Sequence, residues 1–295
     1  MPLPLESVPN VSEGRDPEAL AVLREAFSGP ARLLDVHTDW DHHRSVFTLV
    51  GSGEELVDTL FAGIRAAASR IDLTRHEGAH PRIGAADVVP LVPLEPDAEP
   101  RAREAALALA DRVGSELELP VFFYGRLTED GREPAFFRRG GPHELQRRID
   151  AGELRPDRGP DRLHPTAGGV LIGVRRPLVA FNVNLRSDDV GVAREIARLV
   201  RERDGGFPGV RALGLDLPRA GFVQVSMNVT DWQAAALHEI VARISREADA
   251  RGVEVAGSEL VGLMPAGPAV AAAGEMLRID GFDSSHVLEL RLLES

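Results

Sequence analysis

The sequence of 295 residues contains no cysteine, only one tyrosine and only two tryptophans. Without thiols the protein can form no disulfide, no thiolate zinc site and no cysteine nucleophile. It also lacks an apolar run of the roughly 20 residues that a membrane-spanning helix needs. The first residues lack the basic start and apolar stretch of a signal peptide. We therefore expect a cytoplasmic protein with a sizeable hydrophobic core.

Basic residues are also fewer than acidic residues. Lysine and arginine together number 34 against 46 aspartates and glutamates, which gives a formal net charge of -12. A surface of this sign repels nucleic acid and anionic membranes, so we expect neither as a partner. An anionic substrate would need local arginine clusters, although solvated surface charge explains any single pair more often. Three adjacent pairs are present: Arg138-Arg139, Arg147-Arg148 and Arg175-Arg176.

The first half of the chain alternates strand and helix patterns. In the second predicted helix, apolar residues recur at helical spacing at Leu56, Leu60, Ile64 and Ala67. The predicted strands are 3–8, 33–37, 44–50, 88–94 and 121–124, and the predicted helices are 16–27, 54–69 and 101–113.

The second half repeats this order. Its predicted strands are 178–185, 210–217, 222–228 and 253–261, with one helix around 192–200 and another opened by a capping box from Thr230 to Gln233. Two successive βαββαβ units predict an α+β fold, a duplicated ferredoxin-like two-layer sandwich, with domains at 1–170 and 171–295. Residues 125–169, rich in Gly, Pro and Arg, are expected to form a long connecting segment.

Two strands of the second half carry polar residues at alternate positions. Because successive side chains of a strand point to opposite faces, the polar residues share one face and the apolar residues the other. The polar set is Asn182, Asn184, Gln224, Ser226 and Asn228. An ordinary half-solvated sheet would show the same alternation, but neutral amides also suit a wall that faces a ligand.

Five of the nine histidines fall within a short stretch, together with Asp39 and Asp41. They are His37, His42, His43, His76 and His80. Histidine titrates near neutral pH, so the cluster indicates acid–base or metal chemistry. The second group lies in a loop broken by glycine and proline, so His76 and His80 need not share a helix face as metal ligands would.

Several segments, in this order, resemble the glutamate formiminotransferases, a family that includes the N-terminal domain of formiminotransferase-cyclodeaminase. The resemblance is strongest at 75–88, around His80-Pro81-Arg82, and it departs from the vertebrate pattern at His37 and His43, where that pattern has Asp and Asn. The other matching segments are 8–15, 33–36, 44–48, 156–160, 180–184, 224–228 and 257–263.

The resemblance implies two ferredoxin-like subdomains with a folate tunnel between them, a homodimer, and His80 as the catalytic residue. It also implies that one segment contacts folate, namely Gly159, Pro160, Asp161, Arg162, Leu163, His164, Pro165, Thr166, Ala167 and Gly168. Because His80 precedes this segment and the amide-rich strands follow it, we expect the folate site to draw on both halves.

The implied reaction moves a formimino group from N-formimino-L-glutamate to tetrahydrofolate, the co-substrate, with His80 as general base. We expect Asp39 or Asp41 to stabilise the amidinium cation and Arg44 and Arg82 to hold carboxylates. His42 is expected to help bind substrate. The reaction requires no metal or redox cofactor.

Three other readings stay open at this point. One is a related transferase with a different donor or acceptor, such as a formyl group or an amine other than glutamate. Another is a non-catalytic ligand-binding module, a frequent use of ferredoxin-like repeats. The last is a metal-dependent hydrolase that uses the His/Asp cluster, which metal analysis of the purified protein would separate from the others.

Overall fold

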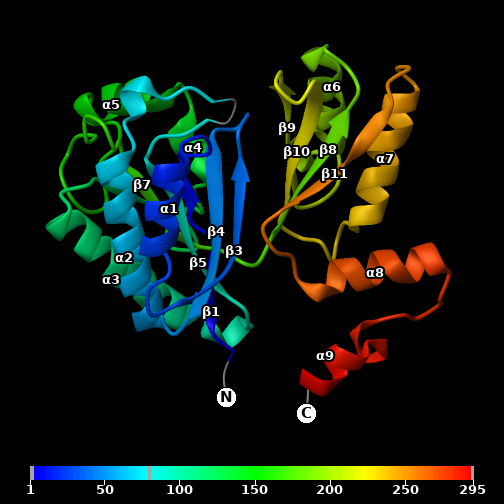
Figure 1. The fold of residues 1–295 in the computed structure, drawn as a ribbon, viewed down its shortest axis with the longest axis horizontal. Helices are drawn as coiled ribbons and strands as arrows, with labels where there is room; N and C mark the ends of the chain where they lie inside the picture. The colour runs from blue at the N-terminus through cyan, green and yellow to red at the C-terminus, as the bar shows by residue number, and fades with distance from the viewer. Residues whose placement is uncertain (1–2, 79–80, 294–295) are drawn as a thin grey trace. The chain divides into compact units, whose positions relative to one another are not determined.

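The computed structural model describes residues 3–78 and 81–293. The chain forms two compact units, Met1–Arg176 and Pro177–Ser295, and each unit has a β-sheet of its own (Figure 1). The fold is mixed α+β with one sheet in each unit, which confirms the α+β part of the prediction. Within residues 3–78 and 81–293 no helix combines the length and apolar character needed to cross a membrane.

The first unit has a seven-stranded sheet in which β1 and β2 both lie between β4 and β5. β3 forms an edge beside β4, and the other side of the sheet continues from β5 to β7 and then β6. The pairings of β5 with β7 and of β6 with β7 are parallel. The strands are β1 (Leu5–Ser7), β2 (Asn10–Val11), β3 (Arg32–Asp39), β4 (Arg44–Gly51), β5 (Ala86–Pro93), β6 (Val121–Gly125) and β7 (Val170–Val174).

Three helices cover one face of this sheet, namely α1 (Pro17–Ala26), α2 (Gly53–Arg70) and α3 (Glu99–Glu116) (Figure 1). α2 begins with a capping box in which Ser52 and Glu55 each satisfy a free backbone amide of the other. Its apolar face packs on the sheet, where Phe47 and Leu49 of β4 are fully buried together with Phe27 at the end of α1. The predicted helix and strand patterns of this unit are therefore confirmed, with ends shifted by a few residues.

The predicted connecting segment contains two helices, α4 (Pro134–Arg138) and α5 (Gly141–Asp150), so that prediction was wrong for its central part. Phe137 and Leu145 are fully buried against Phe122 and Tyr124, whose side chains point away from α1, α2 and α3. These helices are short, and their few apolar residues lie among Gly, Pro and Arg. The composition of the segment therefore did not predict them.

The second unit has a four-stranded sheet in the order β11-β8-β10-β9. Its elements are β8 (Val179–Leu185), α6 (Val190–Val200), β9 (Val210–Leu217), β10 (Phe222–Val229), α7 (Leu237–Asp249), β11 (Val255–Val261), α8 (Ala266–Leu277) and α9 (Leu288–Leu293). The core of this unit is apolar and includes Val183 and Val225 of the sheet, Ile196 of α6 and Ile240 of α7. Short 3-10 helices occupy Leu73–Arg75, Pro96–Ala98, Glu202–Asp204 and Ser284–His286 across the two units.

The predicted capping box in this unit was wrong. α7 begins only at Leu237, and the Thr230 hydroxyl donates to the Gly209 carbonyl at 2.9 Å instead of capping a helix. A threonine next to a strand end can satisfy a neighbouring loop as readily as a helix start, and the sequence pattern does not distinguish the two.

Candidate active site

One face of the first sheet carries polar residues where β3 meets β4. Phe47 and Leu49 of β4 point into the core beneath the helices, so Arg44 points to the opposite face. In the register of the hairpin Asp39 lies across from Arg44, and His37 lies across from Val46. The fold thus places His37 and Asp39 of β3 and Arg44 of β4 on one side of the sheet. Asp39, which we expected in the loop between two strands, is instead the last residue of β3.

Asp39 orients His42 within the β3–β4 turn. Its carboxylate accepts the His42 backbone N–H at 2.7 Å and lies 2.9 Å from Nδ1 of the His42 ring. Burial alone would raise the pKa of Asp39, but the hydrogen bonds from His42 outweigh it and hold that pKa below its ordinary value. Asp39 therefore stays ionised at neutral pH and fixes a largely buried imidazole, while Asp41 is half-buried in the same turn.

Arg82 joins this turn to the loop that follows α2. Its Nη2 donates to the His42 carbonyl at 2.9 Å and its Nη1 to the His43 carbonyl at 3.0 Å. Burial lowers the pKa of Arg82 to about 10, so the guanidinium remains charged at neutral pH. Arg82 therefore holds two loops together through their backbone carbonyls. From the sequence we expected it only to bind a carboxylate.

His43 and His76 stack against each other beside Glu13. Their ring centroids lie 3.8 Å apart with an interplanar angle of 18°. Nε2 of His43 lies 3.2 Å from a Glu13 carboxylate oxygen, which also accepts the backbone N–H groups of residues 14–16. Burial alone would raise the pKa of Glu13, but these backbone hydrogen bonds and His43 together lower it. Glu13 is thus an ionised anchor for the start of α1 and for His43.

Stability is expected to fall in mild acid because of His76. Burial, Arg82 and His43 lower the pKa of His76 to about 4, whereas an unfolded histidine titrates near its ordinary value of about 6.5. Between these values the unfolded chain binds a proton that the folded chain does not, so the free energy of unfolding falls as pH drops through that window. Urea unfolding at several pH values would measure this slope.

The matched variants for that experiment are His76→Gln and His143→Gln. His76→Gln is expected to flatten the slope between about pH 6.5 and 4, because the shifted group is gone. His143 is an exposed residue of α5, so its replacement should leave the slope unchanged. An equal slope in wild type and His76→Gln would contradict the prediction.

Asp87 is a buried junction at the start of β5. One of its carboxylate oxygens accepts the backbone N–H groups of Ile83 at 2.7 Å and Gly84 at 3.3 Å. The other accepts a hydrogen bond from Nη2 of Arg138, at the end of α4. Asp87 therefore fixes the loop that follows the His80-Pro81-Arg82 motif and ties it to a helix 51 residues further along the chain.

The segment expected to contact folate lies beside this loop, inside the first unit. His164 and Gly168 exchange backbone hydrogen bonds at 2.9 Å and close a tight turn. The backbone N–H of Ala85 donates to the Ala167 carbonyl at 2.9 Å, so the turn packs on the residues just before β5. Asp161, Arg162 and Pro165 are exposed, whereas Ala167 and Gly168 are buried; Gly159, Pro160, Leu163 and Thr166 complete the segment.

In the second unit the amide-rich residues form a connected network on one sheet face. Nε2 of Gln224 donates to Oδ1 of Asn184 at 2.9 Å, and Nδ2 of Asn182 donates to a Glu259 carboxylate oxygen at 3.1 Å. Ser226 lies across from Asn182 in the β8–β10 register, and Asn228 lies further along β10 and is exposed. Sequence reasoning missed Glu259, although β11 supplies it next to Asn182.

Two family models match the chain. One, described as the N-terminal subdomain of the formiminotransferase domain, matches residues 4–175, and the other, described as the formiminotransferase domain, matches residues 180–281. The chain belongs to the formiminotransferase family. A Streptococcus pyogenes serotype M1 protein named glutamate formimidoyltransferase is 36% identical over 98% of this chain and 98% of its own length.

Two further formiminotransferase relatives extend the comparison. A Thermoplasma acidophilum glutamate formimidoyltransferase is 37% identical over 98% of this chain and 97% of its own length. A Sus scrofa formimidoyltransferase-cyclodeaminase is also 37% identical, over 88% of this chain but only 50% of its own length. The resemblance inferred from the sequence is therefore confirmed at the level of the family.

The predicted catalytic residue of this formiminotransferase, His80, lies outside the described residues. Two positions before it, Gly78 leaves no room for a side chain. A Cβ at this position would lie 2.6 Å from the His42 carbonyl oxygen and 2.5 Å from Nη2 of Arg82. Only glycine fits without moving the turn that Arg82 holds. The two loops thus approach each other as closely as their backbones allow.

We expect Gly78→Ala to lower formiminotransferase activity more than it lowers stability. The added methyl group would push the loop that carries the His80-Pro81-Arg82 motif (the motif loop) away from the β3–β4 turn. A loss of about tenfold or more in kcat/KM is expected, since a small misplacement of a catalytic loop is costly. The matched control is Gly53→Ala at the start of α2, where the nearest atom would be 3.4 Å away. Equal activity of the two variants would refute this account.

Proposed function

We propose that this protein is a glutamate formimidoyltransferase, which moves the formimino group of N-formimino-L-glutamate to N5 of tetrahydrofolate. The observation that carries the proposal is the similarity to two relatives of that name along 98% of the chain. The fold adds support, because the predicted substrate-binding residues of the first unit come together around the loops on either side of residues 79–80.

The proposed reaction makes one carbon–nitrogen bond and breaks another. The N5 lone pair of tetrahydrofolate attacks the amidinium carbon, and the bond from that carbon to the glutamate nitrogen then breaks. N5 loses a proton and the departing amine gains one, so a single base that accepts and then returns a proton is sufficient. We assign this role to His80, the histidine of the His-Pro-Arg motif.

Roles for the surrounding residues follow from their contacts. The ionised Asp39 would stabilise the cationic amidinium, and His42, which Asp39 orients, would face the donor. Residues 159–168 would contact the folate, because their turn packs beside Asp87 and the motif loop. In the second unit, the network of Asn182, Asn184 and Gln224 offers donors and acceptors that suit the edge of a pterin ring.

We also infer that the two units are copies of one ferredoxin-like unit. In the second unit the four strands lie in the order fourth, first, third, second, and the same relative order runs from β5 through β1 and β2 to β4 and β3 in the first unit. The subdomain limits of 1–170 and 171–295, a homodimer and a cytoplasmic location stay predictions.

The direct test is an assay of the purified chain with formiminoglutamate and tetrahydrofolate. Formation of 5-formiminotetrahydrofolate with an equal amount of glutamate would support the proposal. N-formylglutamate and N-formiminoaspartate serve as matched alternative donors. Turnover of a formyl donor in place of formiminoglutamate would overturn it in favour of a related transferase.

A further inference from the structure

Two arginines on the polar side of the first sheet keep buried N–H groups without a partner. Arg44 opens β4 and Arg138 ends α4, and the Nε atom of each is buried and makes no hydrogen bond within residues 3–78 and 81–293. Buried polar groups in folded proteins are nearly always hydrogen-bonded, so such atoms indicate that a partner is missing. Both atoms are donors, and the missing partner is therefore an acceptor.

The charges around these arginines also favour binding of an anion. Arg138 is paired with Asp87, and the side chains of this pair are 15% and 4% exposed. The second oxygen of Asp87 is already occupied by the Ile83 and Gly84 amides. Burial first, and then repulsion from Arg138 and Arg82, lowers the pKa of Arg44 to about 9, although Asp87 and Asp39 act in the opposite direction. The guanidinium therefore stays charged in an environment that disfavours the charge.

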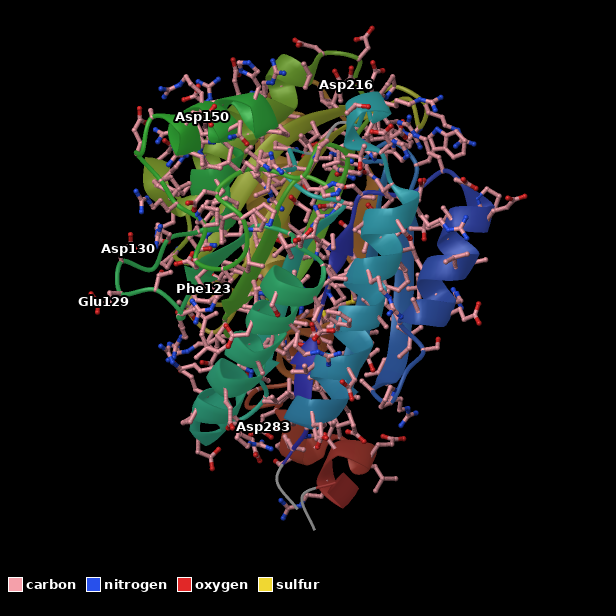
Figure 2. All side chains as sticks on the ribbon, turned by 90° about the vertical axis from the view of Figure 1, so that its left-hand side faces the viewer. Phe123, Glu129, Asp130, Asp150, Asp216 and Asp283 are labelled. Carbon is pink, nitrogen blue, oxygen red and sulfur yellow. The ribbon has the colours of Figure 1, made fainter. Side chains whose placement is uncertain are left out.

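The net negative charge of the protein gives weight to the gathering of positive charge at Arg44, Arg82 and Arg138. The whole chain has a formal net charge of -12, and it contains no lysine, so every one of its 34 basic side chains is arginine. Acidic residues such as Glu129 and Asp130 project outward from the loop after β6 (Figure 2). Positive groups gathered in one place on an acidic protein attract an anion selectively.

Arg82 has a different role from Arg44 and Arg138. Its guanidinium donates to the backbone carbonyls of His42 and His43 and so positions the loops. Within the described part of the chain, the Nε atoms of Arg44 and Arg138 have no hydrogen-bond acceptor. A guanidinium presents its N–H groups as a planar fork that matches a carboxylate. The chemistry therefore separates a loop-holding arginine from a pair suited to a ligand.

We propose that Arg138 and Arg44 form a carboxylate-binding site that holds a substrate of the formimino transfer. This inference rests on the proposed function. Two substrates of that reaction carry carboxylates, the amino-acid donor and the glutamate tail of folate. The site adjoins Asp87, whose other contacts fix the loop directly after the His80-Pro81-Arg82 motif, so a carboxylate bound there would lie near the residues proposed to act on the donor.

The experiment compares Arg138→Met with Arg139→Met. Arg139 is the adjacent residue and is exposed, so its replacement removes the same charge without touching Asp87. Calorimetric titration with L-glutamate, and separately with p-aminobenzoyl-L-glutamate, reads carboxylate binding without any need for turnover. Loss of a charge-assisted hydrogen bond is expected to weaken binding by about 10- to 100-fold in Arg138→Met alone.

The two ligands distinguish the source of the carboxylate. Weaker binding of L-glutamate alone assigns the site to the amino-acid donor, and weaker binding of p-aminobenzoyl-L-glutamate alone assigns it to the folate tail. Unchanged binding of both ligands by Arg138→Met, or an equal loss in Arg139→Met, would overturn the proposal. An inactive wild type that still shows the Arg138-dependent binding would refute the proposed reaction and leave the carboxylate site standing.

A second variant guards against a merely structural effect. Arg138→Lys keeps the positive charge beside Asp87 but loses the planar fork, so it should retain the folded stability of wild type and still bind carboxylate about tenfold more weakly. The donor amides N-formiminoglutamine and N-formiminoisoglutamine complete the test where turnover is present. The amide that removes the bound carboxylate should lose the same factor in wild type and lose nothing further in Arg138→Lys.

Discussion

Replacement of His80 by alanine is expected to lower kcat for formimino transfer by about 10²–10⁴-fold, the range typical for removal of a general base. The free energy of unfolding should change little, because the motif around His80 is rich in glycine and proline and follows a loop rather than a core element. The acidic limb of the pH–rate profile should disappear in the variant, since that limb reports protonation of the base.

The matched control is His143→Ala, which removes an exposed histidine from α5. It should keep wild-type kcat and the wild-type pH profile. If His80→Ala retains more than about a tenth of the wild-type rate, below the effect expected for a general base, another group carries the proton. A loss of rate accompanied by loss of the folded state would require the comparison to be repeated with His80→Gln.

Replacement of Asp87 by alanine is expected to cost about 3–5 kcal/mol of stability, because it leaves the buried Arg138 charge without its partner. It also leaves the Ile83 and Gly84 amides without their acceptor, so the loop before β5 should lose its position. Activity should fall with it. Asp87→Asn keeps an oxygen for the two amides and loses only the charge, so its cost should be smaller.

Urea unfolding of these variants measures the effect, and Asp58→Ala provides the control. Asp58 also pairs with an arginine, Arg112 at 2.6 Å, but the two side chains are 52% and 35% exposed. An exposed pair of this kind contributes about 0–1 kcal/mol. A similar loss in Asp58→Ala and Asp87→Ala would show that burial of the second pair does not matter, contrary to the proposed role of Asp87.

Much of the fold follows from local patterns. The sequence predicted a strand at residues 210–217, the bounds that β9 has, and the helical spacing from Leu56 to Ala67 predicted α2. α4 and α5 were missed because short helices with few apolar anchors have no clear period. The Thr230 pattern failed because the hydroxyl had a competing acceptor, the Gly209 carbonyl, which only the folded chain brings near.

The candidate site was less accessible to prediction. Sequence reasoning found the histidine cluster, Asp39, Arg44 and Arg82, because they stand close together in the chain. It missed Glu13 and Asp87 as site residues, and it noted Arg138 only as one of three pairs of adjacent arginines. The contacts of these residues join distant parts of the chain: Glu13 contacts a histidine 30 positions away, and Arg138 contacts an aspartate 51 positions away. The preference of Arg82 for backbone carbonyls is likewise a property of the folded loops.

The position of β7 has a consequence for how the chain is made. β7 is the last strand of its sheet in sequence order, yet it lies between β5 and β6, and β6 has no other strand neighbour among the described residues. The turn just before β7 is also what supports residues 83–85. A nascent chain emerging N-terminus first therefore has all the residues of the histidine cluster outside the ribosome long before residues 164–174 can support residues 83–85. Residues 164–174 then complete the sheet and brace the motif loop in the same late step.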